Sequence, residues 1–508
     1  MSARSLEGAT VLVIGAGIMG AGIAQVAAQA GHRVRLYDSR DGAAGDAKRK
    51  LAATFDGLVG KGKIAAEAAT ATLARIDTIA ALAEAQDSGL VVEAIVENLE
   101  VKRSLLKQLE ALVAPDCVLA TNTSSISVTA LAHGMAHPER LVGMHFFNPV
   151  PLMKLVEVVS GLHTDAVVAD AIFTLSKSWG KIPVHTTSTP GFIVNRIARP
   201  YYAETLALLQ ERAAEPQVFD ACLKAAGFRM GPCELMDLIG HDTNFSVTNS
   251  VYEANFFDKR FVPSLVQREL VDGGLLGRKS GRGFYRYGEG AVATGLPVAV
   301  HEAPHTAREV TVHGDGAIAD WLEQAATAAL AAQGWGPARN PGSGWVGLVI
   351  DGAHLVLTDG RPAHELVAVL GTDDVAVFDR PIVLPVAPGT ALACALAPSA
   401  SEHWQSQAPA WLAALGFAPQ RIADVPGLVV ARTVAMLINE AADAVQHGVC
   451  TPQGADTAMK LGVNYPAGPF EWLAAWDRRE VMHVLDALDA TYRGERYRVS
   501  PWLRRGAM

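Results

Sequence analysis

The sequence predicts an α/β protein built on a parallel sheet. Two observations support this class: short apolar runs alternate with helical stretches in the first part of the chain, and a glycine turn separates the first run from the first helix. A third observation, a late repeat of one helical motif, predicts additional domains. With 508 residues the chain has room for roughly three or four domains. We expect their boundaries at 1–188, 189–287, 288–421 and 422–508.

The first segment has the order of a doubly wound sheet. Residues 10–14 form an apolar run, residues 18–30 suit a helix, and residues 34–37 form a second run that ends at Asp38. Strand, turn, helix and strand in this order make a βαβ unit, whose strands are parallel. We therefore expect an N-terminal Rossmann-like domain, with further strands in the apolar runs at 90–95, 118–120 and 141–147 and a helix at 100–113.

Helices dominate the second segment. It opens with Pro190-Gly191, continues over 192–212 with apolar residues at helical spacing, and ends near the glycine- and charge-rich stretch 276–287. A connection rich in Gly, Ala, Pro and Val follows at 289–305. The next segment mixes helical pieces with short β-like runs at 345–350 and 375–378, which predicts a reduced Rossmann-like unit.

This smaller unit contains a formal G-x-G-x-x-G match from Gly342 to Gly347. Its glycines precede an apolar run, whereas a phosphate-binding turn follows a strand and opens a helix. We do not expect it to bind a nucleotide.

The last segment repeats the helical domain. Pro426-Gly427, Arg432, Glu440 and Gly468-Pro469 echo Pro190-Gly191, Arg196, Glu204 and Gly231-Pro232 at a nearly constant offset. Chance similarity between two helices rich in Ala and Leu is the alternative, but the shared positions include prolines and glycines. Ala431 stands where the first copy has Asn195, so we expect a degenerate second copy and place the chemistry in the first.

Composition excludes several classes of protein. The net charge of −9 disfavours a nucleic-acid reader, which needs a basic face. No apolar stretch approaches the roughly 20 residues that cross a bilayer. The five cysteines are scattered without a metal-binding spacing. We expect a cytoplasmic protein with neither a disulfide framework nor a metal.

The glycine turn is the first candidate site. It consists of Gly15, Ala16, Gly17, Ile18, Met19 and Gly20, between a predicted strand and a helix. Backbone N–H groups at such a turn can bind a pyrophosphate, and Asp38 at the end of the next strand can accept hydrogen bonds from ribose hydroxyls. These residues predict NAD. Arg40 is the dissenting feature, because a guanidinium accommodates the 2′-phosphate of NADP.

A proline-broken turn forms the second candidate site. His145 and Glu157 are equally spaced on either side of Pro151, within two apolar flanks. If the flanks fold back on each other, the carboxylate can orient the imidazole and stabilise its charged form, which suits a general base. Two such residues are otherwise often unrelated surface or core groups.

A polar run from Thr121 to Ser125 follows a predicted strand. Open α/β sheets bind ligands at the carboxyl ends of their strands, so Asn122 and Ser124 are candidates to hold a substrate oxygen or a cofactor. The alternative for such a run is a loop or a helix cap.

Taken together, these residues resemble the L-3-hydroxyacyl-CoA dehydrogenase family, which includes the 3-hydroxybutyryl-CoA dehydrogenases. The motifs that carry the resemblance span residues 10 to 287 in the order GAGIMG, AIVENLEVK, TNTSS, HFFNPVPLMKLVEV, PGFIVNR and LGRKSGRGFY. The layout after residue 287 is similar to the long bacterial branch of this family linked to phenylacetate catabolism.

The resemblance implies NAD-dependent oxidation of (S)-3-hydroxyacyl-CoA to 3-oxoacyl-CoA. His145 would remove the hydroxyl proton, Glu157 would support it, Ser124 would bond the reacting oxygen, and Asn195 would hold the substrate end of the site. The implied NAD contacts beyond the glycine turn are Asp38, Glu97, Lys102, Asn122, Asn148 and Lys279. Thr54 and Lys61 fall where the family places CoA contacts, although Lys61 is equally well explained as a solvated side chain.

Two rival functions stay open. One is a β-hydroxyacid dehydrogenase that acts on a free acid, a class that uses a catalytic Lys and leaves HFFNP unexplained. The other is a non-catalytic NAD-binding relative. We expect a homodimer, with the two helical copies forming a pseudo-dimer inside each chain, and the sequence leaves the acyl-chain length open.

Overall fold

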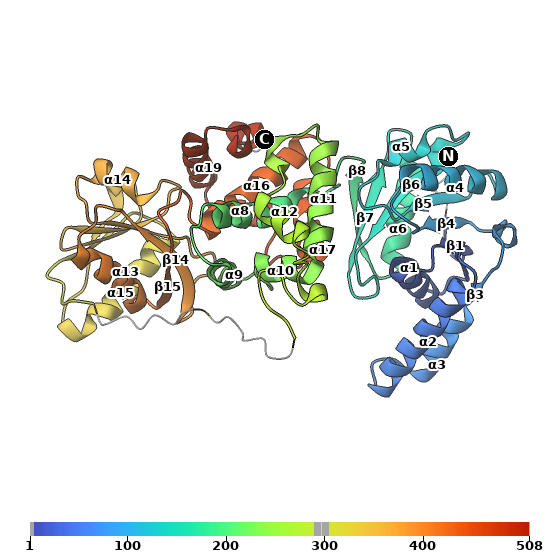
Figure 1. The fold of residues 1–508 in the computed structure, drawn as a ribbon, viewed down its shortest axis with the longest axis horizontal. Coiled ribbons are helices and arrows are strands. Elements are labelled where there is room, and N and C mark those ends of the chain that lie inside the picture. The colour runs from blue at the N-terminus through green and yellow to red at the C-terminus, as the bar shows by residue number, and fades with distance from the viewer. Residues whose placement is uncertain (1–4, 289–295, 297–303, 507–508) are drawn as a thin grey trace. The chain divides into compact units, whose positions relative to one another are not determined.

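The structure is a computed structural model that describes residues 5–288, 296 and 304–506 (Figure 1). The connection predicted at 289–305 lies mostly outside the described residues. The chain forms two compact units. The first comprises residues 1–196 and 444–463, and the second comprises residues 197–443 and 464–508.

An eight-stranded sheet forms the centre of the first unit. Its strand order is β3-β2-β1-β4-β5-β6-β7-β8, and every neighbouring pair is parallel except β6 and β7. The predicted Rossmann-like parallel sheet is confirmed. The strands are β1 (Val11–Ile14), β2 (Val34–Tyr37), β3 (Ile76–Thr78), β4 (Leu90–Glu93), β5 (Val118–Thr121), β6 (Leu141–Phe146), β7 (Leu155–Ser160) and β8 (Ile182–Thr187).

Helices cover both faces of this sheet. Because side chains alternate along a strand, Val11 and Val13 join a core with α1 and α6, whereas Leu12 and Ile14 join a core with α4 and α5. Both cores hold the ends of the central strands in place. The helices are α1 (Ile18–Gln29), α2 (Ala43–Gly60), α3 (Ala66–Ala74), α4 (Leu99–Leu112), α5 (Val128–Ala132) and α6 (Ala166–Ser178).

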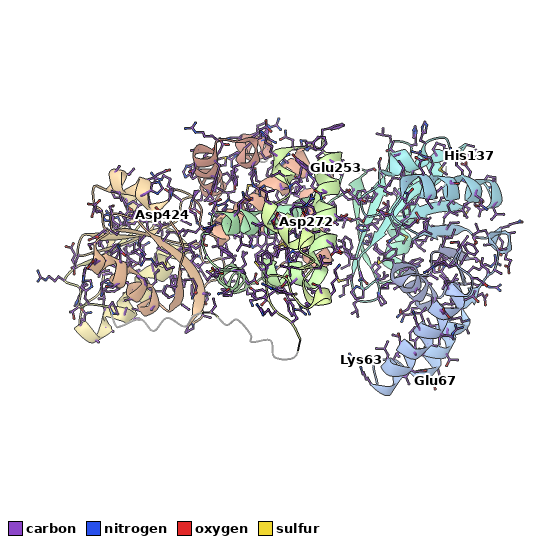
Figure 2. All side chains as sticks on the ribbon, in the orientation of Figure 1. Lys63, Glu67, His137, Glu253, Asp272 and Asp424 are labelled. Carbon is purple, nitrogen blue, oxygen red and sulfur yellow. The ribbon has the colours of Figure 1, made fainter. Side chains whose placement is uncertain are left out.

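Helices α2 and α3 form a hairpin that projects from the sheet. They pack against each other and against α1, and Lys63 and Glu67 mark the far end of the hairpin (Figure 2). The sequence analysis assigned no structure to this segment.

A segment of the second helical copy belongs to the first unit. Residues 444–463 include α17 (Pro452–Gly462), which packs against β7 and β8. The backbone N–H of Thr187 donates to the carbonyl of Val449 at 3.1 Å. The sheet that carries the predicted active site is therefore covered in part by a distant stretch of chain.

The second unit contains a smaller sheet of the same design. Its strand order, β10-β9-β11-β12-β13-β14-β15, matches the first sheet without a counterpart of β3 and with β11 reversed. It is the reduced Rossmann-like unit that the sequence predicts. Its elements are β9 (Val310–His313), α13 (Ala317–Leu330), β10 (Ala338–Asn340), β11 (Gly347–Ile350), β12 (Ala353–Leu357), α14 (Ala363–Leu370), β13 (Val375–Phe378), β14 (Thr390–Leu396), α15 (Glu402–Ala414) and β15 (Phe417–Arg421).

The two helical copies start differently. The helix expected over 192–212 is two helices, α7 (Val194–Ile197) and α8 (Arg199–Gln210), with Pro200 in the first turn of α8. Proline lacks an N–H and its ring displaces the preceding turn, so it begins a helix more readily than it continues one. The second copy has Met436 at this position, and α16 (Val430–Gln446) is continuous.

Short helices complete both copies. The first copy continues with α9 (Pro216–Ala225), α10 (Pro232–Ile239), α11 (His241–Ala254) and α12 (Leu265–Asp272), and the second with α18 (Pro469–Ala475), α19 (Arg478–Tyr492) and α20 (Pro501–Arg505). Within the described ranges, no helix is long and apolar enough to cross a bilayer.

Equivalent residues of the two copies meet in reciprocal pairs. Buried Glu204 of the first copy binds Arg496 of the second at 2.7 Å, and Arg260 of the first binds Glu440 of the second at 3.4 Å. Arg496 occupies the repeat position of Arg260, and Glu440 that of Glu204. An interface in which residue i meets j and j meets i is the pattern of two-fold dimers.

Candidate active site

The glycine turn connects β1 to α1. A Cβ atom at Gly15 would lie 2.5 Å from the carbonyl oxygen of Ala94, and one at Gly20 would lie 1.7 Å from that of Gly15. Only glycine fits either position. At Gly17, the residue that caps α1, a Cβ atom would have no atom within 4 Å apart from those of its chain neighbours. The start of the helix therefore has open space for a pyrophosphate, which its N–H groups and dipole favour.

Asp38 follows β2 beside this turn. Its carboxylate accepts a hydrogen bond from the Ala16 N–H at 2.8 Å and others from the Arg40 backbone and guanidinium. The hydrogen bond from the Arg40 side chain is the main reason that the pKa of Asp38 falls to about 2. Burial opposes this effect, and the N–H groups of Arg40 and Ala16 lower the pKa further. The turn and this ionised acid fit the pyrophosphate and ribose of NAD.

A charge network lies under the polar loop after β5, with Glu93 and Lys102 buried and Glu97 at its exposed edge. Glu97 Oε1 accepts hydrogen bonds from the Thr123 hydroxyl at 2.6 Å and the Ser124 N–H at 2.9 Å. The Lys102 ammonium contacts Glu93 at 2.6 Å and Glu97 at 3.2 Å. Burial disfavours the charged carboxylate, but the ammonium and the hydrogen bonds hold the pKa of Glu97 below its usual value. Lys102 thereby supports the loop that carries Ser124.

Glu93 was not among the site residues predicted from the sequence. It is the last residue of β4 and is fully buried, and besides Lys102 it accepts a hydrogen bond from the Thr121 hydroxyl at 2.7 Å. An acid that ends an otherwise apolar strand was the available signal, because a buried carboxylate requires partners.

His145 and Glu157 face each other across β6 and β7. They are register partners in the antiparallel pair, and His145 Nδ1 lies 2.6 Å from Glu157 Oε2. The imidazole is 7% exposed and the carboxylate is fully buried. With Nδ1–H donating to the acid, Nε2 carries the lone pair that can accept a proton.

Glu157 also binds the start of the helical domain. Its Oε1 accepts hydrogen bonds from the N–H groups of Ile193 and Val194, each at 3.0 Å. The next side chain, Asn195, donates to the Ser124 carbonyl at 3.5 Å. These contacts link all four predicted catalytic residues into one site.

The remaining predicted residues lie in several places. Asn122 accepts a hydrogen bond from the Phe146 N–H at 2.9 Å, and Asn148 follows the end of β6. Lys279 belongs to the second compact unit, where it pairs with Asp242 at 2.5 Å. Thr54 and Lys61 are exposed, on and just after α2. Their contacts with NAD or CoA stay predictions.

The second sheet lacks the counterpart of the base. Its β13 and β14 form an antiparallel pair, as β6 and β7 do, but neither strand contains a histidine or an acid. The carboxylate of Asp379 instead accepts hydrogen bonds from the Val430 N–H at 2.6 Å and the Ala431 N–H at 3.0 Å. The backbone contact with the helical domain is retained, but neither strand carries an imidazole.

A second glycine turn, which the sequence analysis missed, joins β9 to α13. Gly314 has a positive φ of 89°, Gly316 caps the helix, and Asp315 stands where the first turn has Ala16. Pro341 follows β10 as Asp38 follows β2. A carboxylate in the turn repels a pyrophosphate, and a proline offers the ribose no acceptor side chain.

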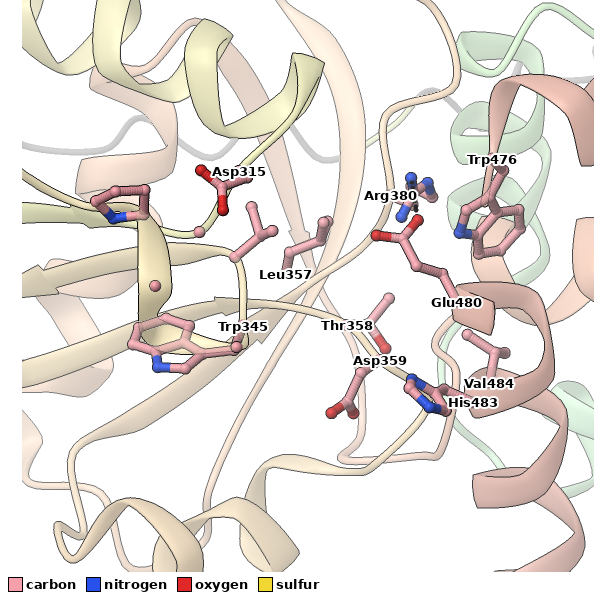
Figure 3. A pocket seen from close by; sticks show the side chains of 15 residues that line it. Asp315, Trp345, Leu357, Thr358, Asp359, Arg380, Trp476, Glu480, His483 and Val484 are labelled. Atoms are coloured by element: carbon pink, nitrogen blue, oxygen red, sulfur yellow. Dashed lines mark ion pairs between the residues drawn. The ribbon is translucent and has the colours of Figure 1, made fainter. Parts of the chain in front are cut away.

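A cavity of about 470 Å³ lies beside this second turn (Figure 3). Arg380 and Glu480 form an ion pair at 2.7 Å next to Trp476, while Asp315 and Trp345 line the opposite side. The cavity is lined by residues of the smaller sheet and of α19. Its imidazole, His483, lies on α19 and not on a strand.

Comparison with family profiles identifies three domain types. Residues 10–189 match the 3-hydroxyacyl-CoA dehydrogenase NAD-binding domain, and residues 191–287 and 427–507 match the C-terminal domain of the same enzymes. Residues 355–426 match the reduced Rossmann-fold domain of 3-hydroxybutyryl-CoA dehydrogenase.

Individual relatives cover the whole chain or its first half. The 3-hydroxyadipyl-CoA dehydrogenase of Escherichia coli is 44% identical over 98% of this chain and 97% of its own length. A crystal structure of 3-hydroxybutyryl-CoA dehydrogenase from Escherichia coli superposes with a TM-score of 0.86, at 42% identity and 98% coverage of both chains. The structure of (S)-3-hydroxybutyryl-CoA dehydrogenase from Ralstonia eutropha matches 55% of this chain and 99% of its own, at 40% identity and a TM-score of 0.54.

Proposed function

Because the chain belongs to the NAD-dependent 3-hydroxyacyl-CoA dehydrogenase family, we propose that it oxidises (S)-3-hydroxyacyl-CoA to 3-oxoacyl-CoA with His145 as the base. The contact of 2.6 Å between His145 and buried Glu157 is the observation that supports this proposal most directly. An imidazole held in this way has one tautomer and one free nitrogen.

Both His145 and Glu157 take part in the reaction. His145 Nε2 accepts the proton of the 3-hydroxyl group, and Glu157 stabilises the imidazolium that forms. The bound NAD would supply the acceptor for the hydride that leaves C3. Ser124 donates a hydrogen bond to the reacting oxygen, and Asn195 holds the substrate end of the site. Apart from His145 and Glu157, no charged side chain is needed for the proton transfer.

The acyl group of the substrate is the finer part of the proposal. The long relative named above acts on 3-hydroxyadipyl-CoA and the crystal structure is named for 3-hydroxybutyryl-CoA. We propose that this chain accepts a short 3-hydroxyacyl-CoA with or without a distal carboxylate, because the relatives named for the adipyl and the butyryl substrates each match 98% of the chain.

An absorbance assay tests the function. The purified chain should oxidise NADH with acetoacetyl-CoA and reduce NAD with (S)-3-hydroxyadipyl-CoA. Turnover of the free 3-hydroxy acid in place of the CoA ester would support the β-hydroxyacid dehydrogenase. NADH binding without turnover of either ester would support a non-catalytic relative.

Asp38 should determine the choice of cofactor. We expect Asp38→Ser to raise the Kd for NADH by about tenfold to a hundredfold, since charge-assisted hydrogen bonds contribute about 1.5–3 kcal/mol. The same change releases Arg40, so NADPH should bind better than it does to the unchanged chain. Fluorescence titration of both cofactors measures the shift. Asp41→Ser, at an exposed neighbour, is the control, and an unaltered Kd in Asp38→Ser would place the ribose elsewhere.

The proposal also includes the domain organisation, the intrachain pseudo-dimer and a cytoplasmic location. The proposed domain boundaries are 1–188, 189–287, 288–421 and 422–508. The reciprocal pairs Glu204–Arg496 and Arg260–Glu440 support the pseudo-dimer, and five cysteines without a disulfide are consistent with the cytoplasm. Light scattering of the full chain, and of one ending at residue 288, tests the proposed homodimer and pseudo-dimer. A shortened chain that stays monodisperse and fully active would contradict the pseudo-dimer.

A further inference from the structure

We propose that the degenerate helical copy positions the catalytic pair of the first copy, with Gly462 of α17 as the positioning residue. This inference rests on the proposed function of His145 and Glu157. It assigns a role in catalysis to a part of the chain that carries neither a base nor a cofactor-binding turn of its own.

Gly462 lies against the active-site strands without a side chain between them. A Cβ atom at this position would lie 2.8 Å from Leu155 Cδ2, 2.9 Å from Val194 Cγ2 and 3.6 Å from Phe147 Cε1. Real Cβ atoms do not approach other atoms within 3.0 Å, so even alanine would push on Leu155 and Val194. The close approach of α17 therefore depends on glycine.

These neighbours flank the catalytic pair on both sides. The Phe147 ring packs against the His145 imidazole with centroids 4.5 Å apart. The Val194 N–H donates to Glu157 Oε1 at 3.0 Å, and Leu155 belongs to the strand that carries Glu157. A shift of α17 is thus transmitted to the imidazole through Phe147 and to the carboxylate through Val194 and β7.

The segment around α17 is anchored next to the same site. The Thr187 N–H at the end of β8 donates to the Val449 carbonyl at 3.1 Å, and Arg196 contacts His447 Nδ1 at 3.1 Å. Arg196 directly follows Asn195. Together with Gly462, these contacts hold the turn and helix of the second copy against β7, β8 and the start of the first helical copy.

This placement explains how the second copy can serve catalysis after losing the polar pair. Strands β13 and β14 carry neither a histidine nor an acid, but residues 444–463 of the second helical copy pack into the compact unit that contains His145. Productive geometry is sensitive to small displacements, and a shift of about 1 Å can cost about a hundredfold in rate. A rigid support therefore has a measurable effect on turnover.

Gly462→Ala in the full chain tests the proposal. We expect kcat for acetoacetyl-CoA reduction to fall about tenfold or more, because the reacting geometry is disturbed, while KM and the Kd for NADH change little. The deuterium isotope effect with 4-deuterated NADH should rise, since hydride transfer becomes slower than product release. The pH profile of kcat should also change, because the His145–Glu157 contact is altered. Rates are expressed per titrated NADH site, so misfolded chains are not counted.

Gly494→Ala is the matched control, because a Cβ there meets only the Tyr492 carbonyl oxygen, at 3.9 Å. It should retain the kcat, isotope effect and pH profile of the unchanged chain. If Gly462→Ala does not fold, Val194→Ala loosens the same contact without overpacking it, and it should reproduce the loss of kcat and the larger isotope effect in a milder form.

A Gly462→Ala protein with a lower Tm but unchanged kcat, isotope effect and pH profile would overturn the inference, because α17 would then contribute packing alone. A Val194→Ala protein whose kcat and isotope effect equal those of the unsubstituted chain would also overturn it. Failure of the proposed function is distinguishable: the unchanged chain would then not turn over acetoacetyl-CoA, or His145→Gln would retain its rate.

Discussion

Replacing His145 with glutamine should lower kcat by about 10²–10⁴-fold, the usual contribution of a positioned general base. Glutamine is similar in length to histidine and keeps a hydrogen-bonding group near Glu157, but its amide does not accept a proton at neutral pH. Because the glycine turn and Asp38 are untouched, the Kd for NADH should stay nearly the same. Steady-state assays with acetoacetyl-CoA and fluorescence titration of NADH measure the two quantities.

His185→Gln is the control for this prediction. His185 lies on β8 with its side chain 48% exposed and paired with Asp170 at 3.5 Å, so the same chemical change there should leave kcat unaltered. A His145→Gln protein that loses NADH binding together with activity, or that unfolds well below the unchanged chain, would indicate a structural histidine. The assignment of the base would then be wrong.

Replacing Lys102 with methionine should lower the free energy of unfolding by about 3–5 kcal/mol, the usual cost of leaving one partner of a buried ion pair alone. The Lys102 ammonium is 1% exposed and Glu93 is fully buried. Without the ammonium, Glu93 keeps only hydrogen bonds, including those from the Thr121 hydroxyl and the Ile95 N–H. Urea unfolding followed by circular dichroism measures the change.

The same substitution should reduce activity. Lys102 also lies 3.2 Å from Glu97, which accepts hydrogen bonds from the Thr123 hydroxyl and the Ser124 N–H. Loss of the ammonium therefore loosens the loop that carries Ser124. Lys107→Met, an exposed change on the same helix, should affect neither quantity.

The double variant Glu93→Met with Lys102→Met should recover part of the lost stability, because it removes both charges. Two outcomes would show that the ion pair does not hold this region together. One is an unfolding free energy in Lys102→Met equal to that of the Lys107→Met control. The other is a double variant less stable than Lys102→Met alone.

Local patterns account for the parts of the site that were predicted from sequence. The glycines of the first turn and the acid after the next strand are close in the chain. Backbone atoms approach too closely for a side chain at Gly15 and Gly20, and Asp38 stands where a ribose-binding acid is expected. The pairing of His145 with Glu157 is also local, because two strands joined by a short turn place residues equally spaced from that turn opposite each other.

Other parts of the site depend on chain segments far apart in sequence. The contact of Gly462 with Leu155 and Val194 joins the last part of the chain to its first sheet. The turn at Gly314 escaped notice because Asp315 and Ala319 differ from the residues of the first turn. Its equivalence became visible only through the strand order and the positive φ of Gly314.

The amino-acid sequence by itself determined the fold class, the cofactor-binding turn and the family, because hydrophobic periodicity and short motifs act over one or two neighbouring elements. Only the tertiary structure decided that Lys102 is shared between Glu93 and Glu97 and that α17 reaches Phe147 and Val194. Contacts of this kind depend on how whole elements pack, and one residue's spacing from another along the chain does not specify that packing.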